Sequence, residues 1–261
     1  NSRYVPDALV NIGDYYFEDN DYEKALQLYQ QVEKYPDAGV LAYAAYKQAW
    51  TLYNLADYEA CLSKMLNVIT VAERQHKAGV MGAYDLMEEA RSELAYPYSK
   101  VGKPQAALRF FKRYAPADYL RITAKLAELY TEQTEYQKSS KLLRTLVREA
   151  QTVAKTNKSD QRHLVLSFQR QIVNNAHRGE NRRATVAEVK SLIQLLKENK
   201  KAPLSKKFKK EERTIESLVA EIANTYQKEF ATTRTAQTLD LTQELFEQYL
   251  NAFRASKNAY D

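Results

Sequence analysis

The chain of 261 residues carries 39 Lys and Arg against 33 Asp and Glu, a formal net charge of +6, and contains six Gly and six Pro. Because loop-forming residues are few and helix-favouring residues are abundant, the composition predicts an all-α protein without strands. A single cysteine, Cys61, excludes an internal disulfide, and three separated histidines lack the spacing of a zinc site, so no metal or other cofactor is expected. No apolar run approaches the roughly 18 residues that a membrane-spanning helix needs.

Charge and tyrosine are unevenly distributed along the chain. Residues 1–120 contain 13 Lys and Arg against 16 Asp and Glu, whereas residues 121–261 contain 26 against 17. Of the 20 tyrosines, 17 lie at or before Tyr136. An acidic, tyrosine-rich first half and a basic second half indicate two surfaces with different partners.

The first predicted element is a pair of helices between Pro6 and Pro36. Pro6 suits the first turn of a helix, and Asn20–Asp21 predicts the turn between the two helices. Small and apolar residues recur at helical spacing on both sides of this turn. The side chains expected to pack the two helices together are Leu9, Ile12, Gly13, Tyr16, Ala25, Leu28, Tyr29 and Val32.

The stretch 21–29 returns in altered form at 57–62, 103–108 and 135–140, which predicts three more helix pairs. In the second pair, Gln48 stands where the first has Ile12, so we expect it to be partly buried, or hydrogen-bonded if buried. The unit before the third pair is longer than the others. Either the second helix of the second pair extends to about Lys77, or an extended loop lies there.

Two further features complete the predicted elements. Pro97 lies inside the first helix of the third pair, where it removes a backbone hydrogen bond and should kink the helix. The fourth pair should end near Thr156. Beyond it the helical period continues without the repeated stretch, and predicts two further pairs at about 163–196 and 210–253.

Gly13, Tyr16, Ala25, Tyr29 and Pro36 together resemble the signature of the tetratricopeptide (TPR) repeat, W-x2-L-G-x2-Y followed by A-x3-F and P. The resemblance implies a right-handed solenoid of about six antiparallel helix pairs. It further implies four TPR-like repeats over residues 1–150 and degenerate helical repeats over residues 151–261. TPR proteins as a family bind peptides or partner domains on a concave face lined by the first helix of each pair.

A protein-binding site is therefore expected on the first helices, beside their packing stripes. Tyr43, Tyr46, Trp50 and Tyr53 follow i, i+3, i+7, i+10 and share one helix face. Trp and Tyr are frequent binding anchors, so we expect this face to bind another protein or an extended peptide; the alternative is that it packs against a neighbouring helix. Acidic residues nearby favour a basic or neutral ligand. The complete predicted set is Asp14, Phe17, Tyr43, Tyr46, Trp50, Tyr53 and Tyr96.

The second candidate site is the basic stretch from Lys197 to Arg213. Such runs can contact phosphates of an anionic membrane or of nucleic acid; the alternative is a solvated loop and helix start. Because no aromatic residue except Phe208 is interleaved, nucleic acid is not the expected partner. The residues assigned to this anionic-surface site are Arg178, Arg182, Arg183, Lys200, Lys201, Lys206, Lys207, Lys209 and Lys210.

The sequence shows no phosphate-binding loop, nucleophile elbow or zinc-protease motif, so neither an enzyme nor a small-molecule substrate is expected. We predict a non-catalytic interaction scaffold. The alternative is a basic adaptor that docks on a membrane or nucleic acid through residues 178–213. The segment 35–50 resembles bacterial cell-envelope TPR proteins, which implies a periplasmic or envelope location, while a cytoplasmic location stays open. The chain begins at Asn1 without an initiator methionine or a visible signal peptide, so we expect a mature product or an excised fragment.

Overall fold

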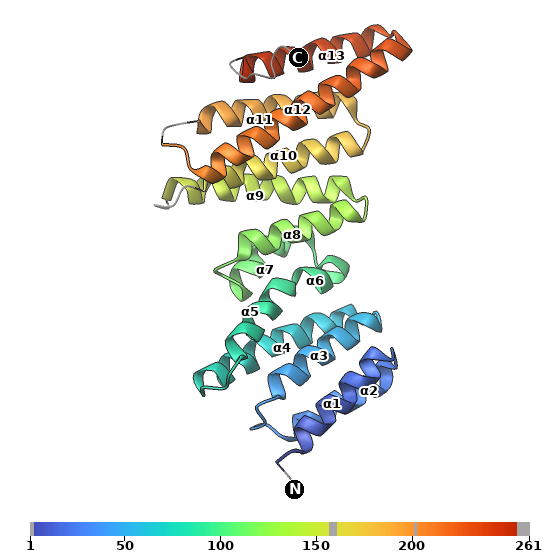
Figure 1. Cartoon of the computed structure of the whole chain (residues 1–261), viewed down its shortest axis with the longest axis vertical. Coiled ribbons are helices and arrows are strands. Elements are labelled where there is room, and N and C mark those ends of the chain that lie inside the picture. The colour runs from blue at the N-terminus through green and yellow to red at the C-terminus, as the bar shows by residue number, and fades with distance from the viewer. Residues whose placement is uncertain (1–2, 157–160, 201–202, 255–261) are drawn as a thin grey trace. The chain divides into compact units, whose positions relative to one another are not determined.

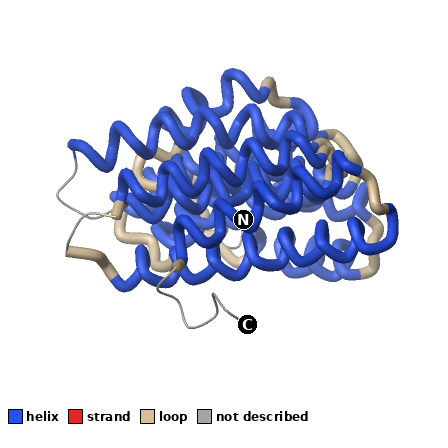
Figure 2. The backbone as a smooth tube through the Cα atoms, turned by 90° about the horizontal axis from the view of Figure 1, so that it is seen from above, coloured by secondary structure: helices blue, strands red, loops and turns tan. Residues whose placement is uncertain are grey.

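The computed structural model describes residues 3–156, 161–200 and 203–254. Within these ranges the chain forms helices and short turns and no strand, as the colours of Figure 2 show. The prediction of an all-α protein is confirmed. The helices are α1 (Val5–Glu18), α2 (Tyr22–Gln31), the 3-10 turn η1 (Val32–Lys34), α3 (Leu41–Asn54), α4 (Tyr58–Lys77), α5 (Ala83–Glu93), α6 (Ala95–Val101), α7 (Pro104–Tyr114), α8 (Tyr119–Glu132), α9 (Tyr136–Thr156), α10 (Arg162–Arg178), α11 (Arg182–Asn199), α12 (Lys206–Thr233) and α13 (Ala236–Phe253).

Over the described residues these helices form six antiparallel pairs, as the chain order in Figure 1 shows. The pairs are α1 with α2, α3 with α4, α5 and α6 with α7, α8 with α9, α10 with α11, and α12 with α13. The predicted helical-repeat fold of about six pairs is therefore confirmed. The chain also divides into two compact units, residues 1–126 and 127–261, with the boundary inside α8. The predicted loss of the TPR signature near residue 150 stays a prediction.

Close packing in the first pair explains its small residues. A β-carbon on Gly13 would lie 2.6 Å from Cε1 of Tyr29, well inside van der Waals contact, so only glycine fits there. Ala25 and Tyr29 have no exposed surface. Gly13 and Ala25, both expected to pack the first pair, therefore let α1 and α2 approach closely.

The turns of four pairs, α1–α2, α3–α4, α8–α9 and α10–α11, share the same backbone geometry. The residue two positions before the second helix has a left-handed conformation, with φ of 63° at Asn20, 61° at Ala56, 61° at Thr134 and 55° at Glu180. The next residue donates its backbone N–H to the carbonyl five residues earlier, as Asp21 does to Tyr16 at 2.9 Å and Asn181 to Ala176 at 3.2 Å. This is the Schellman ending of a helix. The same turn geometry recurs at Glu180, between α10 and α11.

Glycine and proline residues explain where helices α4 and α5 end. Helix α4 runs to Lys77, so the first of the two alternatives for the long unit is correct. Gly79 and Gly82 follow it with φ of 81° and 76°. The effect of Pro97 is larger than the predicted kink: its ring would clash with the carbonyl of Glu93, and the helix is divided there into α5 and α6.

One residue of α1 lies differently from the prediction. Ile12, expected in the core, is 48% exposed, whereas Val10 is buried against Val32, Leu41 and Ala44. The cause is the neighbouring pair, because α3 covers the Val10 side of α1. The expectation for Gln48 is confirmed: its side chain is buried and its Nε2 donates to the Tyr29 carbonyl at 3.0 Å.

Unit 2 has its own apolar core, built from α10 to α13. The buried residues of α12 follow one helix face and include Phe208, Ile215, Val219 and Ile222, none of which has exposed surface. Leu245 of α13 and Leu192 of α11 pack in the same cluster. Polar side chains of α12 are therefore left on the opposite face. No described helix is long and apolar enough to cross a membrane.

Candidate functional site

The first helices of the second and third pairs place aromatic side chains on one surface of unit 1. Helix α3 contacts both α1 and α5. Tyr43, Tyr46, Trp50 and Tyr53 follow one face of α3, and Tyr96 joins them from α6. These five residues are named the aromatic surface below.

Trp50 is the centre of this surface. The rings of Tyr46, Tyr53 and Tyr96 lie 6.5, 5.4 and 5.8 Å from the Trp50 ring, between centroids. These are the separations of tilted and edge-to-face aromatic pairs. Trp50 thus packs partly within the chain, which is the alternative that the sequence left open. Tyr43 lies at the edge and is 38% exposed.

The predicted residues Asp14 and Phe17 of α1 lie beside the Tyr43 end of the surface. Asp14 accepts hydrogen bonds from the hydroxyls of Tyr29 at 2.6 Å and Tyr43 at 3.3 Å. Lys47 forms an ion pair with Asp14 at 3.2 Å, and its Nζ lies 4.1 Å from the centre of the Phe17 ring. The charge of Asp14 is therefore compensated inside the chain, and Lys47 contributes a cation–π contact.

Two carboxylates of α5 lie on the other side of α3 and have no cationic partner among the described residues. Tyr46 donates its hydroxyl to Glu93 at 2.8 Å and is also 3.0 Å from Glu89, and Trp50 Nε1 donates to Glu93 at 3.1 Å. Partial burial raises the pKa of Glu93 above its ordinary value, with the nearby charge of Glu89 adding to the effect. Burial likewise raises the pKa of Tyr46, so it stays a hydroxyl donor.

A cavity of about 410 Å³ opens beside these carboxylates, between the start of α3, the end of α4 and α5. Tyr43, Tyr46, Asp85 and Glu89 line it, and Met81, which is 96% exposed, lies at its edge. It is named the Tyr43 cavity below. Sequence reasoning missed Asp85 and Met81, because they belong to the loop and helix that follow the long α4. The order of the residues in the sequence did not indicate that Asp85 and Met81 lie beside α3.

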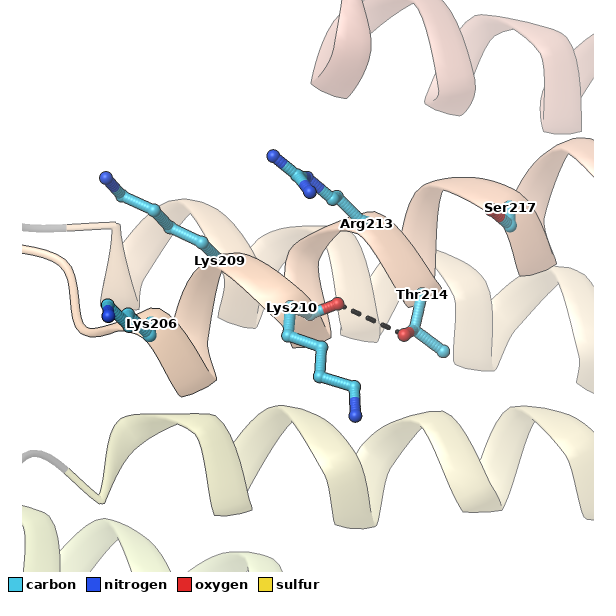
Figure 3. Close-up of a pocket in the computed structure, with 6 residues that line it drawn as sticks. All are labelled: Lys206, Lys209, Lys210, Arg213, Thr214 and Ser217. Atoms are coloured by element: carbon cyan, nitrogen blue, oxygen red, sulfur yellow. Dashed lines mark hydrogen bonds between the residues drawn. The ribbon is translucent and has the colours of Figure 1, made fainter.

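The basic stretch forms the start of α12 in unit 2. Ser205 caps this helix by accepting from the Phe208 N–H at 3.2 Å. A shallow cavity of about 450 Å³ is lined by Lys206, Lys209, Lys210 and Arg213, with the hydroxyl residues Thr214 and Ser217. Figure 3 shows Lys209 and Arg213 extending to one side of the helix and Lys210 to the other. Lys206, Lys209, Lys210 and Arg213 are named the basic face of α12.

The acidic residues of this segment are already paired with other cations. Glu211 accepts from Arg170 of α10 at 2.6 Å, and Glu212 pairs with Lys200 at 2.7 Å. The predicted site residue Lys200 is therefore neutralised. Among the described residues no ion pair joins any cation of the basic face, and Lys207 is also exposed on α12. Lys201 lies outside the described residues.

Arg178, Arg182 and Arg183 do not join this face, although the sequence suggested one shared patch. Arg182 pairs with Glu229, near the far end of α12. Since an α-helix rises 1.5 Å per residue, Glu229 lies about 35 Å from Lys206 along the helix. Arg178 and Arg183 flank Arg182 at the turn between α10 and α11. The single patch over 178–213 is replaced by two separate basic regions.

A third cavity, of about 720 Å³, lies between α9, α10 and α11. Its wall includes Asn175, whose Nδ2 donates to Ser139 at 2.9 Å and to Ser140 at 3.2 Å. Thr131 in turn donates to Asn175 Oδ1 at 2.9 Å. These side chains satisfy one another, so the cluster fixes packing in unit 2. Across the described ranges no three His, Cys, Asp or Glu side chains come together as metal ligands.

Comparison with known proteins finds a similar solved structure but no match in sequence. No family model matches the chain. No curated protein matches it in sequence. Among solved structures, the C-terminal part of a TPR repeat-containing protein from Cytophaga hutchinsonii is similar, with 13% identity and a TM-score of 0.34 over 97% of this chain and 98% of that chain. The all-α helical-repeat fold is established by the chain's own helix pairs.

Proposed function

We propose that the protein is a non-catalytic interaction scaffold that binds a peptide segment or a domain of another protein on the aromatic surface of unit 1. In this proposal a basic side chain of the partner enters the Tyr43 cavity. The observation that carries it is the position of Asp85 and Glu89 beside the rings of Tyr43 and Tyr46. No ion pair within the described ranges joins either carboxylate to a cation.

The chemistry of the cavity favours a cation. A guanidinium or ammonium group there would gain charge-assisted hydrogen bonds from the carboxylates and a cation–π contact from a tyrosine ring. Lys47 and Phe17 make the same kind of contact inside the chain, at 4.1 Å. The rings are also held in place before binding, since Tyr46 and Trp50 donate to Glu93 and Tyr43 donates to Asp14. Less side-chain freedom is then lost on binding.

The test uses an array of immobilised peptides, in which each peptide that contains Lys or Arg has a copy with Gln in its place. We expect the protein to retain the basic peptides and not their Gln copies. The double variant Asp85→Asn/Glu89→Gln should bind these peptides about tenfold more weakly. This factor corresponds to the free energy of about one charge-assisted hydrogen bond. Trp50, the single tryptophan, reports binding in solution by its fluorescence.

A matched control removes the same charge elsewhere in unit 1. Asp37 and Glu59 are exposed, so Asp37→Asn/Glu59→Gln should leave peptide affinity unchanged. Equal weakening in both double variants, or equal retention of the basic peptides and their Gln copies, would contradict the proposal.

We further propose that this scaffold belongs to a bacterial cell-envelope complex. The proposal is based on the resemblance of residues 35–50 to envelope TPR proteins. Fractionation of the native cells tests this location. Recovery of the protein with periplasmic or envelope markers is expected, and recovery with cytoplasmic markers alone would reject it.

A further inference from the structure

The start of α12 concentrates positive charge in a way that opposes the stability of the helix. Lys206, Lys207 and Lys209 lie in its first turn, which contains no acidic residue. The amide dipoles already give a helix start a partial positive charge, so cations are unfavourable there. Lys210 and Arg213 add to them within the next turn. A local arrangement that lowers stability without a compensating contact is characteristic of a functional site.

In the described part of unit 2 no ion pair cancels the charge at this place. Glu211 and Glu212, the acidic residues between the cations, are held by Arg170 and Lys200. The basic face therefore projects a net positive potential, reinforced by the helix start.

We infer that the basic face of α12 is a docking surface for an anionic phospholipid membrane, separate from the protein-binding surface of unit 1. Clusters of four to eight Lys and Arg on an amphipathic helix attract acidic lipid headgroups. Helix α12 has this construction, because Phe208 and Ile215 are buried in the core of unit 2 while Lys206, Lys209, Lys210 and Arg213 are exposed.

The arrangement of the cations fits a lipid surface better than a single bound phosphate. Lys209 and Arg213 extend to one side of the helix and Lys210 to the other, so their charged groups do not converge on one point (Figure 3). A fluid layer of headgroups can meet charges spread in this way. Nucleic acid is less favoured because the neighbouring aromatic, Phe208, is fully buried and cannot stack on a base.

Binding should be purely electrostatic. Between residues 203 and 217, all of them described, no large apolar side chain is exposed. This segment therefore has no side chain to insert between lipids. Attachment should therefore be lost when salt screens the charges.

The test is co-sedimentation of the whole chain with vesicles of phosphatidylcholine alone or with about 30 mol% phosphatidylglycerol. We expect binding to the anionic vesicles only, at about 0.1 M salt, and release at about 0.5 M. The triple variant Lys206→Gln/Lys209→Gln/Arg213→Gln should bind about 100-fold more weakly, at about fivefold for each cation. Its thermal stability should be equal or higher, because the cations oppose the helix dipole.

A control variant removes three exposed cations of unit 2 outside this face, as Lys141→Gln/Arg148→Gln/Lys228→Gln. Both triple variants have the same net charge, so a general charge effect would weaken them equally and overturn the inference. Absence of wild-type binding to anionic vesicles, with retention of single-stranded or duplex DNA instead, would also overturn it and assign the face to nucleic acid.

Discussion

Trp50 donates its indole N–H to Glu93 at 3.1 Å, and this bond joins the centre of the aromatic surface to helix α5. The same carboxylate oxygen accepts the hydroxyl of Tyr46 at 2.8 Å. A half-buried carboxylate thus holds two aromatic anchors in position. Since it has no cationic partner among the described residues, its charge is available to a ligand and sensitive to pH.

The substitution Glu93→Gln should remove a pH dependence of stability. The pKa of Glu93 is raised from its ordinary value of 4.5, mainly by desolvation, so between that value and the raised one the folded state binds more protons than the unfolded state. The free energy of unfolding therefore falls as pH rises through this window. Relative to wild type, Glu93→Gln should gain stability from pH 4.5 to neutral pH, because its amide oxygen can still accept both bonds.

Urea unfolding followed by Trp50 fluorescence across this pH range measures the effect. Glu59→Gln, at an exposed position of the same unit, is the matched control. A constant stability difference between Glu93→Gln and wild type at every pH would contradict the prediction.

Replacing Ala56 by glycine should stabilise unit 1 by about 0.5–1 kcal/mol. Ala56 has a φ of 61°, a left-handed conformation that costs a residue with a β-carbon roughly 1–2 kcal/mol. Glycine avoids this cost but loses more freedom on folding, which reduces the gain. Urea unfolding measures it, with Ala8→Gly, at an exposed position of helix α1, as a comparison that should lose about 1 kcal/mol. A loss of stability in Ala56→Gly would show that the turn is not strained.

Cys61 should not react with a thiol reagent while unit 1 is folded. Its side chain is fully buried, and burial raises the pKa of the thiol to about 12. The reactive thiolate is therefore almost absent at neutral pH. Colorimetric labelling with a disulfide reagent should proceed only after urea unfolds the protein, and fast labelling in native buffer would contradict the structure.

Replacing Asn175 by alanine should destabilise unit 2 by about 2–3 kcal/mol. Its side chain makes three hydrogen bonds, to Thr131, Ser139 and Ser140. Thr131 and Ser139 also bond to each other, so the cost of removing Asn175 is the loss of these three bonds and of the donor to the buried Ser140 hydroxyl. Because Trp50 belongs to unit 1, thermal unfolding is followed by far-UV circular dichroism. Exposed Asn224→Ala is the control and should change stability by less than about 0.5 kcal/mol. An equally small effect at Asn175 would mean that water replaces the lost bonds.

Local patterns predicted much of the fold, because the helices follow from local periodicity and turn residues. Asn20–Asp21 identified the first turn, and the absence of a breaker between Tyr58 and Lys77 made α4 long. Burial set by other pairs could not be predicted in this way. Gln48 is buried because it reaches back to Tyr29 of the preceding pair. Ile12, at the corresponding place in α1, has no earlier helix within the described residues and stays exposed.

In the candidate sites, too, local spacing predicted some relationships between residues and not others. The shared face of Tyr43 and Trp50 follows from spacing alone. The bonds of Tyr46 to Glu89 and Glu93, and of Trp50 to Glu93, depend on how α5 packs beside α3 after the long α4, which a linear pattern does not contain. For the basic residues, closeness in the sequence was misleading: Arg182 pairs with Glu229, a full helix length away from the lysines that begin α12.

The left-handed turn at Asn20, Ala56, Thr134 and Glu180 makes the chain extendable. Each turn closes its backbone hydrogen bonds with its own neighbours, so its geometry does not depend on which pair comes before or after. Joining Thr134 directly to Asn181 would delete two helices, α9 and α10, and recreate the same turn between α8 and α11. Evolution can therefore lengthen or shorten the chain between the aromatic surface and α12 one pair at a time, while the side chains around them change freely.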